Sequence, residues 1–411
     1  MHPKMKHIYV GVDTHKRTHT AVMVDCFGEK LGELTFENKP TAYDKLLDKV
    51  TEHTPEGLTP VFGLEDVGGA GRALAVYLLK KKLAVKKVDA SLTFNERRNQ
   101  PIIHKTDSYD GLCIARVLAN KLNELPQAKP QDVYWTLRIL VKRRDAIVKA
   151  STALKNQLHS HIVHHYPSYK RFFSVFDCNT ALEFWERYPS PAILEGVTVE
   201  ELAEFLRGPS SGFFSTDKAK EILGLVKQDG ETTTQYQESR DFMVKTFVRQ
   251  LKQNNEELKL LEAEMKNIMA RLGYKLETML GVDLVTAASF VSEIGDIERF
   301  PSADKLAKYA GISPVIFSSG DKDKKFRNRQ GNRDLYGLFH NLAARHVCCG
   351  RNGNRPVNPL FYDYYRKKMS KGKTQHQAVI CIMRRLVNII YGLMKNKTAY
   401  IHPTIPNSQA K

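Results

Sequence analysis

In the first part of the chain, short apolar runs alternate with segments whose apolar residues recur at helical spacing. The first three runs predict neighbouring antiparallel strands at residues 7–13, 18–25 and 30–37, with Gly28 at a turn. Further strands and helices are predicted at residues 41–50, 60–65, 72–82, 84–88 and 107–120. A strand meander that is followed by alternating helices and strands predicts an α/β domain with a mixed sheet.

Apolar residues recur at three- and four-residue spacing in two long stretches of the middle region. The stretches cover residues 137–162 and 244–272, and they predict two long antiparallel helices packed as a coiled coil. Between them, residues 166–235 contain several prolines and are expected to form a small irregular subdomain. An ordinary helical bundle is the alternative, because each stretch is short for a coiled coil. Polar residues also interrupt both stretches, at Arg144, Ser151 and Asn254.

The last region is again helical in pattern, but its elements are shorter. We expect a glycine hairpin between two short helices near residues 280–296 and a helix at 303–310. A loop at 314–331 and two final helices at 335–348 and 376–394 follow. The predicted domains are therefore residues 1–128 (α/β), 129–272 (long helices with an inserted subdomain) and 273–411 (mainly α).

The charge balance indicates a polyanionic partner. The chain has 63 Lys and Arg residues against 45 Asp and Glu residues, a formal net charge of +18. Such a protein attracts phosphate backbones through counterion release, although a merely soluble basic protein has the same balance. No signal-peptide core or long uninterrupted apolar segment is evident, and the six cysteines form no CxxC pair. We expect a cytoplasmic, nucleoid-associated protein without a structural zinc site.

Four carboxylates fall where predicted strands and helices begin or end. Asp13 ends the first strand, and Glu65 ends a later one. Asp107 and Asp110 lie three residues apart at the start of a helix, on one side of its first turn. Sites assemble at strand ends in α/β proteins, and clustered carboxylates repel one another unless cations neutralise them. Such oxygen ligands favour Mg²⁺ or Mn²⁺, which would clamp a phosphodiester.

Each carboxylate also has a structural explanation when it is taken alone. Asp107 fits a helix N-cap, Asp110 a favourable first-turn charge, and Asp13 the start of a turn. The functional reading gains weight because all four residues fall where the strand–helix order of one known fold would place them.

That fold is the RNase H-like (RuvC-like) nuclease fold, and within it the chain resembles the DEDD-type insertion-sequence transposases, which are related to the Piv DNA invertases. In the first domain the resemblance rests on Glu65, which has glycines soon after it, and on residues 11–25 (GVDTHKRTHTAVMVD) and 105–118 (KTDSYDGLCIARVL). In the last domain it rests on residues 293–300 (EIGDIERF), 311–314 (GISP), 318–320 (SSG) and 331–335 (GNRDL). The resemblance thus covers nearly the whole chain.

The sequence departs from the family pattern at three places. The family often has Asn-Pro where this chain has residues 89–90 (DA), and Pro-Gly-Val-Gly where it has residues 280–283 (LGVD). Tyr336 replaces a common Arg, which removes one expected interaction with phosphate. None of these departures affects the four carboxylates.

The resemblance implies a second catalytic element in the last domain. A serine before a glycine attacks DNA in this family, and Ser319 matches that position best, with Ser318 as the second choice. Serine is a weak nucleophile that needs activation, and no base lies nearby in sequence. Help would therefore come from the carboxylate–metal site of another segment or subunit.

The resemblance also implies the partners. They are donor and target DNA and a structured guide RNA that pairs with both. The long helices, for their part, suit assembly of the chain into a homodimer or homotetramer. Basic residues near the predicted sites are our candidates for binding phosphate backbones: Lys105, Lys142, Arg143, Lys322, Lys324, Lys325, Arg327, Arg329 and Arg333.

Three functions are compatible with these features. The first is a DNA recombinase that moves its own insertion element and uses both the carboxylates and Ser319. The second is a metal-dependent, structure-specific endonuclease similar to a junction resolvase, which would not need Ser319. The third is a DNA-binding coiled-coil protein without catalytic activity, in which the carboxylates would be dispensable.

Overall fold

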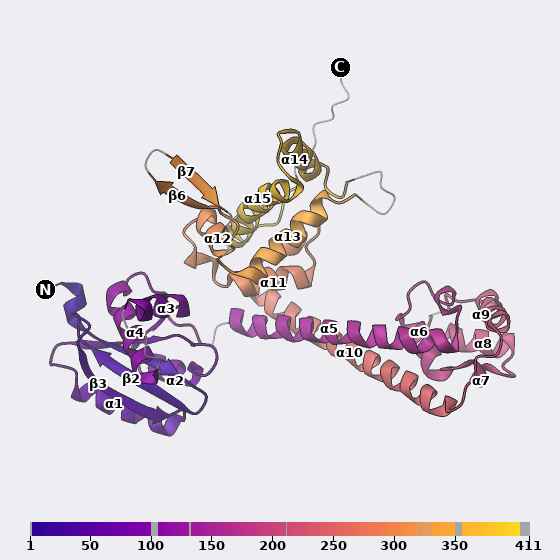
Figure 1. Cartoon of the computed structure of the whole chain (residues 1–411), viewed down its shortest axis with the longest axis horizontal. Helices are drawn as coiled ribbons and strands as arrows, with labels where there is room; N and C mark the ends of the chain where they lie inside the picture. The colour runs from indigo at the N-terminus through magenta and orange to yellow at the C-terminus, as the bar shows by residue number, and fades with distance from the viewer. Residues whose placement is uncertain are drawn as a thin grey trace, which may run out of the picture. The chain divides into compact units, whose positions relative to one another are not determined.

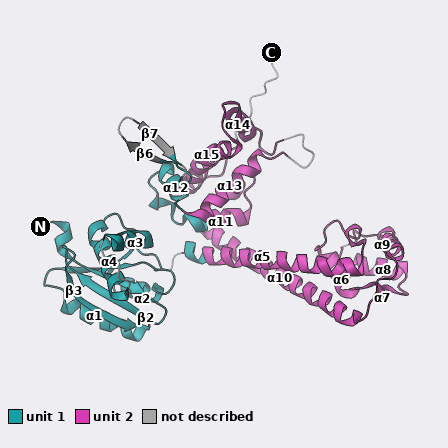
Figure 2. Cartoon of the chain, viewed as in Figure 1, with its two compact units in different colours: residues 1–136, 291–331 teal, residues 137–290, 332–411 magenta. Residues whose placement is uncertain are grey.

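The structure is a computed structural model that describes residues 2–99, 106–130, 133–210, 212–319, 322–326, 328, 330–349 and 356–402. Figure 1 shows the course of the chain. Two compact units are distinguished in Figure 2: residues 1–136 with 291–331, and residues 137–290 with 332–411.

A five-stranded mixed sheet forms the centre of the first unit. Its strands are β1 (His7–Thr14), β2 (Thr18–Val24), β3 (Lys30–Glu37), β4 (Thr59–Leu64) and β5 (Ala84–Lys87). Their order is β3-β2-β1-β4-β5. β1, β2 and β3 pair antiparallel, whereas β4 lies parallel to both β1 and β5. This confirms the predicted antiparallel start and mixed sheet.

Helices cover both faces of this sheet (Figure 1). α1 (Tyr43–Glu52) and α2 (Arg72–Lys80) pack on the face to which Val10 and Val12 contribute. α4 (Asp107–Lys121) packs on the face of Tyr9. Because β1 is covered on both faces, its sequence is almost continuously apolar. A further helix, α3 (Ala90–Arg98), was not expected; Asp89 caps it by accepting a hydrogen bond from the Ser91 backbone N–H.

Two glycines set how closely α4 approaches β1. A Cβ on Gly11 would lie 2.2 Å from the Gly111 carbonyl oxygen and 2.3 Å from the Ala115 backbone nitrogen. The helix backbone therefore rests directly on the strand. Gly11 lies two residues before Asp13, and Gly111 directly follows Asp110, so this packing positions the helix start beside the strand end.

Residues 291–331 of the first unit contain α12 (Ala303–Tyr309) and a two-stranded hairpin. Its strands are β6 (Val315–Ser319) and β7 (Lys322–Phe326), which pair antiparallel. The expectation of a loop over residues 314–331 is therefore wrong. The many lysines concealed the strand pattern, although Gly-Asp between two such runs is a common hairpin signal.

Two long helices dominate the second unit: α5 (Val133–His165) with 33 residues and α10 (Gln237–Leu272) with 36 residues. Residues further along α5 contact residues earlier in α10, so the two helices run antiparallel as expected. Arg144 Nε lies 2.7 Å from Glu262 Oε1, and Asn254 Nδ2 donates to Ser151 Oγ at 3.0 Å. The polar residues that interrupt the two apolar patterns therefore have partners on the facing helix.

The segment between the long helices is helical, which corrects the expectation of an irregular subdomain. It contains α6 (Asn179–Arg187), α7 (Pro191–Leu194), α8 (Val199–Arg207) and α9 (Thr216–Asp229). Buried aromatic residues, among them Tyr166, Phe172, Phe184 and Trp185, fill its core. The prolines misled the expectation, since Pro191 occupies the first turn of α7, where proline is favourable.

The remaining helices are α11 (Leu284–Ile294), α13 (Arg333–Val347), α14 (Pro359–Ser370) and α15 (Gln375–Asn396), of which α14 was not expected. Short 3-10 helices lie at Pro3–Lys6, Pro40–Ala42, Tyr169–Arg171, Leu276–Thr278 and Ile297–Arg299. Within the described residues, α15 is long and apolar enough to cross a membrane. It contacts α13 and α14 and buries residues such as Ile382, Leu386 and Ile390, as a core helix does.

Candidate active site

The carboxyl ends of β1 and β4 place two of the four predicted carboxylates at one edge of the sheet. The strands are parallel neighbours in which Val12 pairs with Leu64. Asp13, which still belongs to β1, and Glu65, which directly follows β4, are the next residues, so they occupy adjacent positions at this end of the sheet. Asp13 lies on the α4 face, because alternate residues of a strand share a face with Tyr9 and Gly11.

The first turn of α4 carries the other two carboxylates. Thr106 is the N-cap of this helix, and its hydroxyl accepts a hydrogen bond from the Tyr109 backbone N–H. Asp107 is therefore the first helical residue, and the alternative that it is the N-cap is wrong. Both Asp107 and Asp110 stand where negative charge is favourable beside the helix N-terminus.

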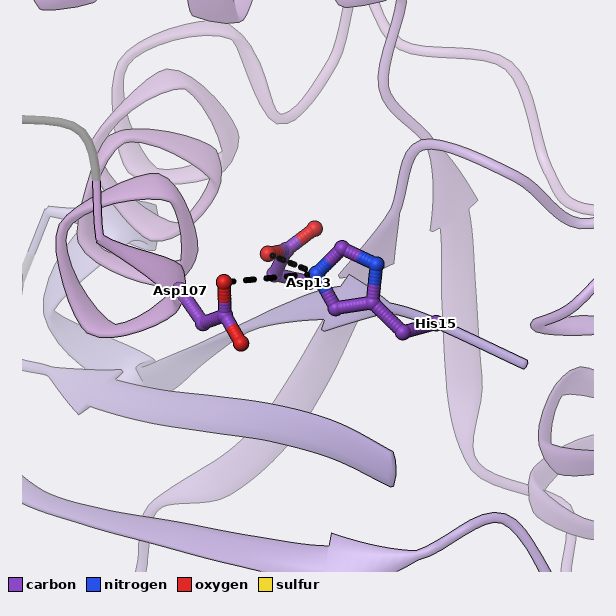
Figure 3. A group of neighbouring side chains, drawn as sticks. All are labelled: Asp13, His15 and Asp107. Carbon is purple, nitrogen blue, oxygen red and sulfur yellow. Dashed lines mark ion pairs between the residues drawn. The ribbon is translucent and has the colours of Figure 1, made fainter. Parts of the chain in front are cut away.

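A histidine that the sequence analysis did not single out joins Asp13 and Asp107. His15 Nε2 lies 3.1 Å from Asp13 Oδ2 and 3.3 Å from Asp107 Oδ1 (Figure 3). One ligand atom from each of the three residues falls within 4.8 Å of the others. The sequence could have indicated His15 by its position two residues after Asp13, just beyond the end of β1.

The pKa of the Asp13 carboxyl is raised, chiefly because burial disfavours the charged form. His15 opposes this effect, while the nearby carboxylates of Asp110, Asp107 and Glu65 raise the pKa further. All four predicted carboxylates are therefore close enough to interact electrostatically. A like-charged cluster of this kind attracts a cation.

Asp110 has a cationic partner that was also missed. Arg97 Nη2, from α3, lies 2.6 Å from Asp110 Oδ1, and both side chains are mostly buried. The helix that carries this arginine had itself escaped prediction, so the pair could not be anticipated. Arg97 neutralises one member of the cluster and ties α3 to the start of α4.

The donor set suits a divalent cation. Carboxylate oxygens are the preferred ligands of Mg²⁺ and Mn²⁺, and imidazole nitrogen is acceptable to Mn²⁺. Asp13, His15 and Asp107 already direct their ligand atoms toward one another, and Glu65 follows the neighbouring strand. The raised pKa of Asp13 also fits, because a bound cation would relieve the repulsion that causes part of it.

The loop after Glu65 is organised by Asp66. Its carboxylate accepts backbone N–H hydrogen bonds from Gly68, Gly69 and Ala70, at 3.2, 2.6 and 2.8 Å. A Cβ at Gly71 would lie 2.4 Å from the Asp66 carbonyl oxygen. The glycines after Glu65 therefore allow a tight turn that fixes the end of β4.

The predicted serine lies in the hairpin of residues 315–326. Ser319, at the end of β6, pairs with Lys322, and Ser318 pairs with Asp323. Lys324 and Lys325 belong to β7. Lys105, Arg327 and Arg329 lie outside the described residues.

The other residues predicted to bind nucleic acid already have intramolecular partners. Lys142 Nζ lies 2.8 Å from Asp334 Oδ2, and Arg143 Nη2 lies 3.8 Å from Glu257 Oε1. The exposed Arg333 places its guanidinium 5.3 Å from the centre of the Tyr336 ring. A phosphate would have to compete with these partners.

Two family models match this chain, one in its first part and one in its last part. A DEDD transposase family model of the IS110 type, described as "Transposase", matches residues 10–167, and a model described as "Transposase IS116/IS110/IS902 family" matches residues 273–375. An insertion element IS116 protein of Streptomyces clavuligerus is 25% identical over 406 residues, which cover 98% of each chain. An IS110 protein of Streptomyces coelicolor is 24% identical over 411 residues, covering 96% of this chain and 95% of its own length.

A third relative is similar over about a third of the chain. The pilin gene-inverting protein of Moraxella lacunata is 30% identical over 142 residues, 33% of this chain and 42% of its own length. Together, the fold and these matches define a transposase, an enzyme class that carries out DNA strand transfer. The chain belongs to the IS110/IS116 family of insertion-sequence transposases.

Proposed function

We propose that the protein moves its own insertion element by using two catalytic parts, a DEDD carboxylate site that holds Mg²⁺ or Mn²⁺ and the Ser319 nucleophile. The observation that carries this proposal is the convergence of Asp13, His15 and Asp107 at the end of β1. Glu65 and Asp110 contribute to the electrostatic environment of Asp13 there. Such a concentration of negative charge at a strand end is typical of a phosphodiester-processing centre.

We assign the first domain to the RNase H-like, RuvC-like fold. The mixed sheet, the two strand-end carboxylates and the helix-start pair support this assignment. The division into domains 1–128, 129–272 and 273–411, with the long helices as a coiled coil, remains part of the proposal. The antiparallel pairing of α5 and α10 supports it.

In the proposed mechanism Asp13, Glu65, Asp107 and Asp110 hold the metal, which would polarise the phosphate when bound. The Asp66 turn keeps Glu65 in place, and the close packing of Gly11 against α4 keeps the other carboxylates in place. The Ser319 oxygen forms a bond to phosphorus while the bond from phosphorus to a sugar oxygen breaks. The serine proton leaves, and the sugar oxygen gains one, so a covalent protein–DNA ester conserves the phosphodiester energy for strand exchange.

The substrate is DNA, and we propose that a structured RNA guides the enzyme to donor and target sequences. The net charge of +18 supports binding of several nucleic-acid strands. We further propose assembly into a homodimer or homotetramer in the cytoplasm, together with the nucleoid. In such an assembly the carboxylates of one subunit can serve the serine of another.

The test is covalent trapping. Purified protein with its co-purifying RNA is incubated with element DNA and Mg²⁺, and the products are separated on a denaturing gel. We expect a protein–DNA adduct that is lost in Ser319→Ala and retained in the neighbouring variant Ser318→Ala. Asp13→Asn should abolish it as well, whereas Asp48→Asn, an exposed carboxylate of α1, should not.

The alternatives give different gels. Metal-dependent cleavage that persists in Ser319→Ala, without an adduct, would contradict the serine mechanism and indicate a structure-specific endonuclease. Binding without any cleavage, unchanged in Asp13→Asn, would indicate a DNA-binding protein without catalytic activity. Loss of the adduct in Ser318→Ala but not in Ser319→Ala would transfer the nucleophile to Ser318.

A further inference from the structure

A pocket of about 700 Å³ opens at the same edge of the sheet as the carboxylates, but on the opposite face. Residues from α1 and α2, together with the segments that follow β1, β3 and β4, line it. The carboxylate site lies on the α4 face, whereas α1 and α2 cover the other. The pocket volume lies in the range of sites that hold ligands the size of a nucleotide. We call it the basic pocket.

The charge of the basic pocket is opposite to that of the carboxylate site. Lys16, Arg72 and Lys80 line it, and none of its described lining residues is acidic. Lys16 and Lys80 are exposed. Arg72 is held at the rim, because its Nε donates to the Pro130 carbonyl at 3.0 Å and its guanidinium lies 4.0 Å from the centre of the Trp135 ring. Such a rim suits an anion, and a phosphate above all.

The rim is preformed by Asn38, which ties three segments together. Its Nδ2 donates to the Ala70 carbonyl at 3.0 Å and to the carbonyls of His15 and Lys16, each at 3.4 Å. Its Oδ1 accepts a hydrogen bond from the Tyr43 hydroxyl at 2.6 Å. The shape of the pocket therefore does not depend on a ligand, which lowers the entropic cost of binding.

The floor of the pocket is apolar and aromatic. Tyr43 is buried, Val76 and Tyr77 are half-buried, and the two tyrosine rings meet edge to face with centres 5.4 Å apart. A cationic rim over such a floor combines the two interactions that bind single-stranded nucleic acids, phosphate pairing and packing of the base.

The basic pocket and the carboxylate site are close along the chain. Lys16 directly follows His15, which contacts Asp13 and Asp107. The three residues from Asp13 to Lys16 span at most about 10 Å, which matches three nucleotide steps at a rise of about 3.4 Å per nucleotide of one strand. A strand engaged at the carboxylates can therefore reach the pocket by crossing the end of β1.

We propose that the basic pocket binds a nucleotide of the nucleic-acid strand that runs on from the carboxylate site. Its phosphate lies against Lys16, Lys80 and Arg72, and its base packs on the half-buried Val76 and Tyr77. This proposal rests on the proposed function for the position of the scissile phosphate. The pocket then anchors the strand a few nucleotides from the reaction and fixes its direction over the edge of the sheet.

Binding without chemistry tests the proposal. A short fluorescent single-stranded DNA and an RNA of the same sequence are titrated with the full chain in EDTA over a range of salt concentrations. The salt dependence is the slope of the logarithm of the binding constant against the logarithm of the salt concentration. In Lys16→Gln/Lys80→Gln we expect the magnitude of this slope to fall by about 0.7 for each phosphate that the variant no longer neutralises. The matched control Lys45→Gln/Lys82→Gln removes the same charge from exposed lysines outside the pocket and should keep the salt dependence.

A photoreactive benzoylphenylalanine at position 76 supplies the second readout. We expect an adduct with DNA, RNA or both, which identifies the source of the strand, and no adduct from the same group at position 45. Unchanged salt dependence in the pocket variant, or absence of an adduct at position 76, would overturn the proposal. Because the assay excludes metal, it stands apart from the covalent-trapping test, whose failure would remove the catalytic assignment but leave these results interpretable.

Discussion

Polar and charged residues lie in partly buried positions in two regions of the molecule. In one region their neighbours carry the same charge, and in the other they have complementary partners. At the end of β1, three further carboxylates lie near Asp13, and burial together with these neighbours raises the pKa of its carboxyl against the opposing effect of His15. Between α5 and α10, polar groups meet complementary partners, as Arg144 does with Glu262 and Asn254 with Ser151. The first arrangement raises the free energy of the folded state, while the second limits the cost of burial.

This difference separates a candidate site from a structural interface. Both regions interrupt an apolar pattern, so the interruption by itself is uninformative. Complementary partners explain the interruptions in the long helices through folding alone. Carboxylates gathered beside one another weaken the fold, and such strain is characteristic of residues selected for function. Substitutions in one region or the other test this distinction.

The largest effect is expected from Gly11→Ala, which attacks the packing that assembles the carboxylates. The new Cβ would lie 2.2 Å from the Gly111 carbonyl oxygen, and backbone atoms cannot move aside cheaply. We expect the first domain to lose about 3 kcal/mol or more of unfolding free energy. Thermal melting should show this loss, and metal-dependent DNA cleavage should fall with it as α4 is displaced.

Gly63→Ala in β4 is the matched control. Its Cβ would lie 3.1 Å from the side chains of Leu118 and Val88, which can adjust. A smaller loss of stability is therefore expected. If Gly11→Ala were as mild as Gly63→Ala, the close strand–helix packing could not be what positions the carboxylates.

The next effect concerns the matched pair in the long helices. Asn254→Ala removes the partner of the buried Ser151 hydroxyl, and we expect a loss of about 1–3 kcal/mol of unfolding free energy. Replacing both residues, in Ser151→Ala/Asn254→Leu, leaves no unpaired polar group and should recover most of this loss. Chemical denaturation of the three proteins measures the difference. If the double variant were no more stable than Asn254→Ala, the two residues would contribute more to stability than their mutual hydrogen bond.

Asp13→Asn should act in the opposite direction and stabilise the first domain by about 1 kcal/mol at neutral pH. Since the folded-state pKa of Asp13 lies above its unfolded value, the ionised carboxylate weakens folding at neutral pH. This penalty disappears as the pH falls below the unfolded pKa, so the advantage of the variant should shrink in acid. Melting temperatures across this pH range test the sign. An unchanged or lower melting temperature at neutral pH would mean that the cluster is not strained.

The fold was predictable wherever one pattern dominated a segment. The mixed sheet and both long helices could be predicted because their buried residues recur at the spacing of a strand or a helix. The elements that escaped have weaker patterns: α3 buries Thr93 but few other residues, and α14 buries Phe361. The hairpin was concealed because β7 (KDKKF) is charged along most of its length and has no apolar alternation.

The candidate site was predictable only as far as residue chemistry marks it. Carboxylates at strand ends and at a helix start stand out, and the structure brings their charges together. His15 and Arg97 did not stand out, because their importance lies in interactions across the fold. Asn38 likewise acts through three carbonyl groups that are distant in sequence. Such partners become visible only when the segments have been packed.

The smallest effect on stability is expected from Arg143→Gln, which asks whether a matched residue can also serve nucleic-acid binding. The Arg143–Glu257 pair is 3.8 Å long and exposed, so its removal should change the unfolding free energy by less than about 0.5 kcal/mol. Arg144→Gln is the control, since its partner Glu262 lies at 2.7 Å in a more protected position and its removal should cost more. If Arg143 also binds a phosphate, the salt dependence of DNA binding should fall by about 0.9 in its variant while the melting temperature stays constant. A change in melting temperature without a change in salt dependence would instead place Arg143 with the structural pairs of the long helices.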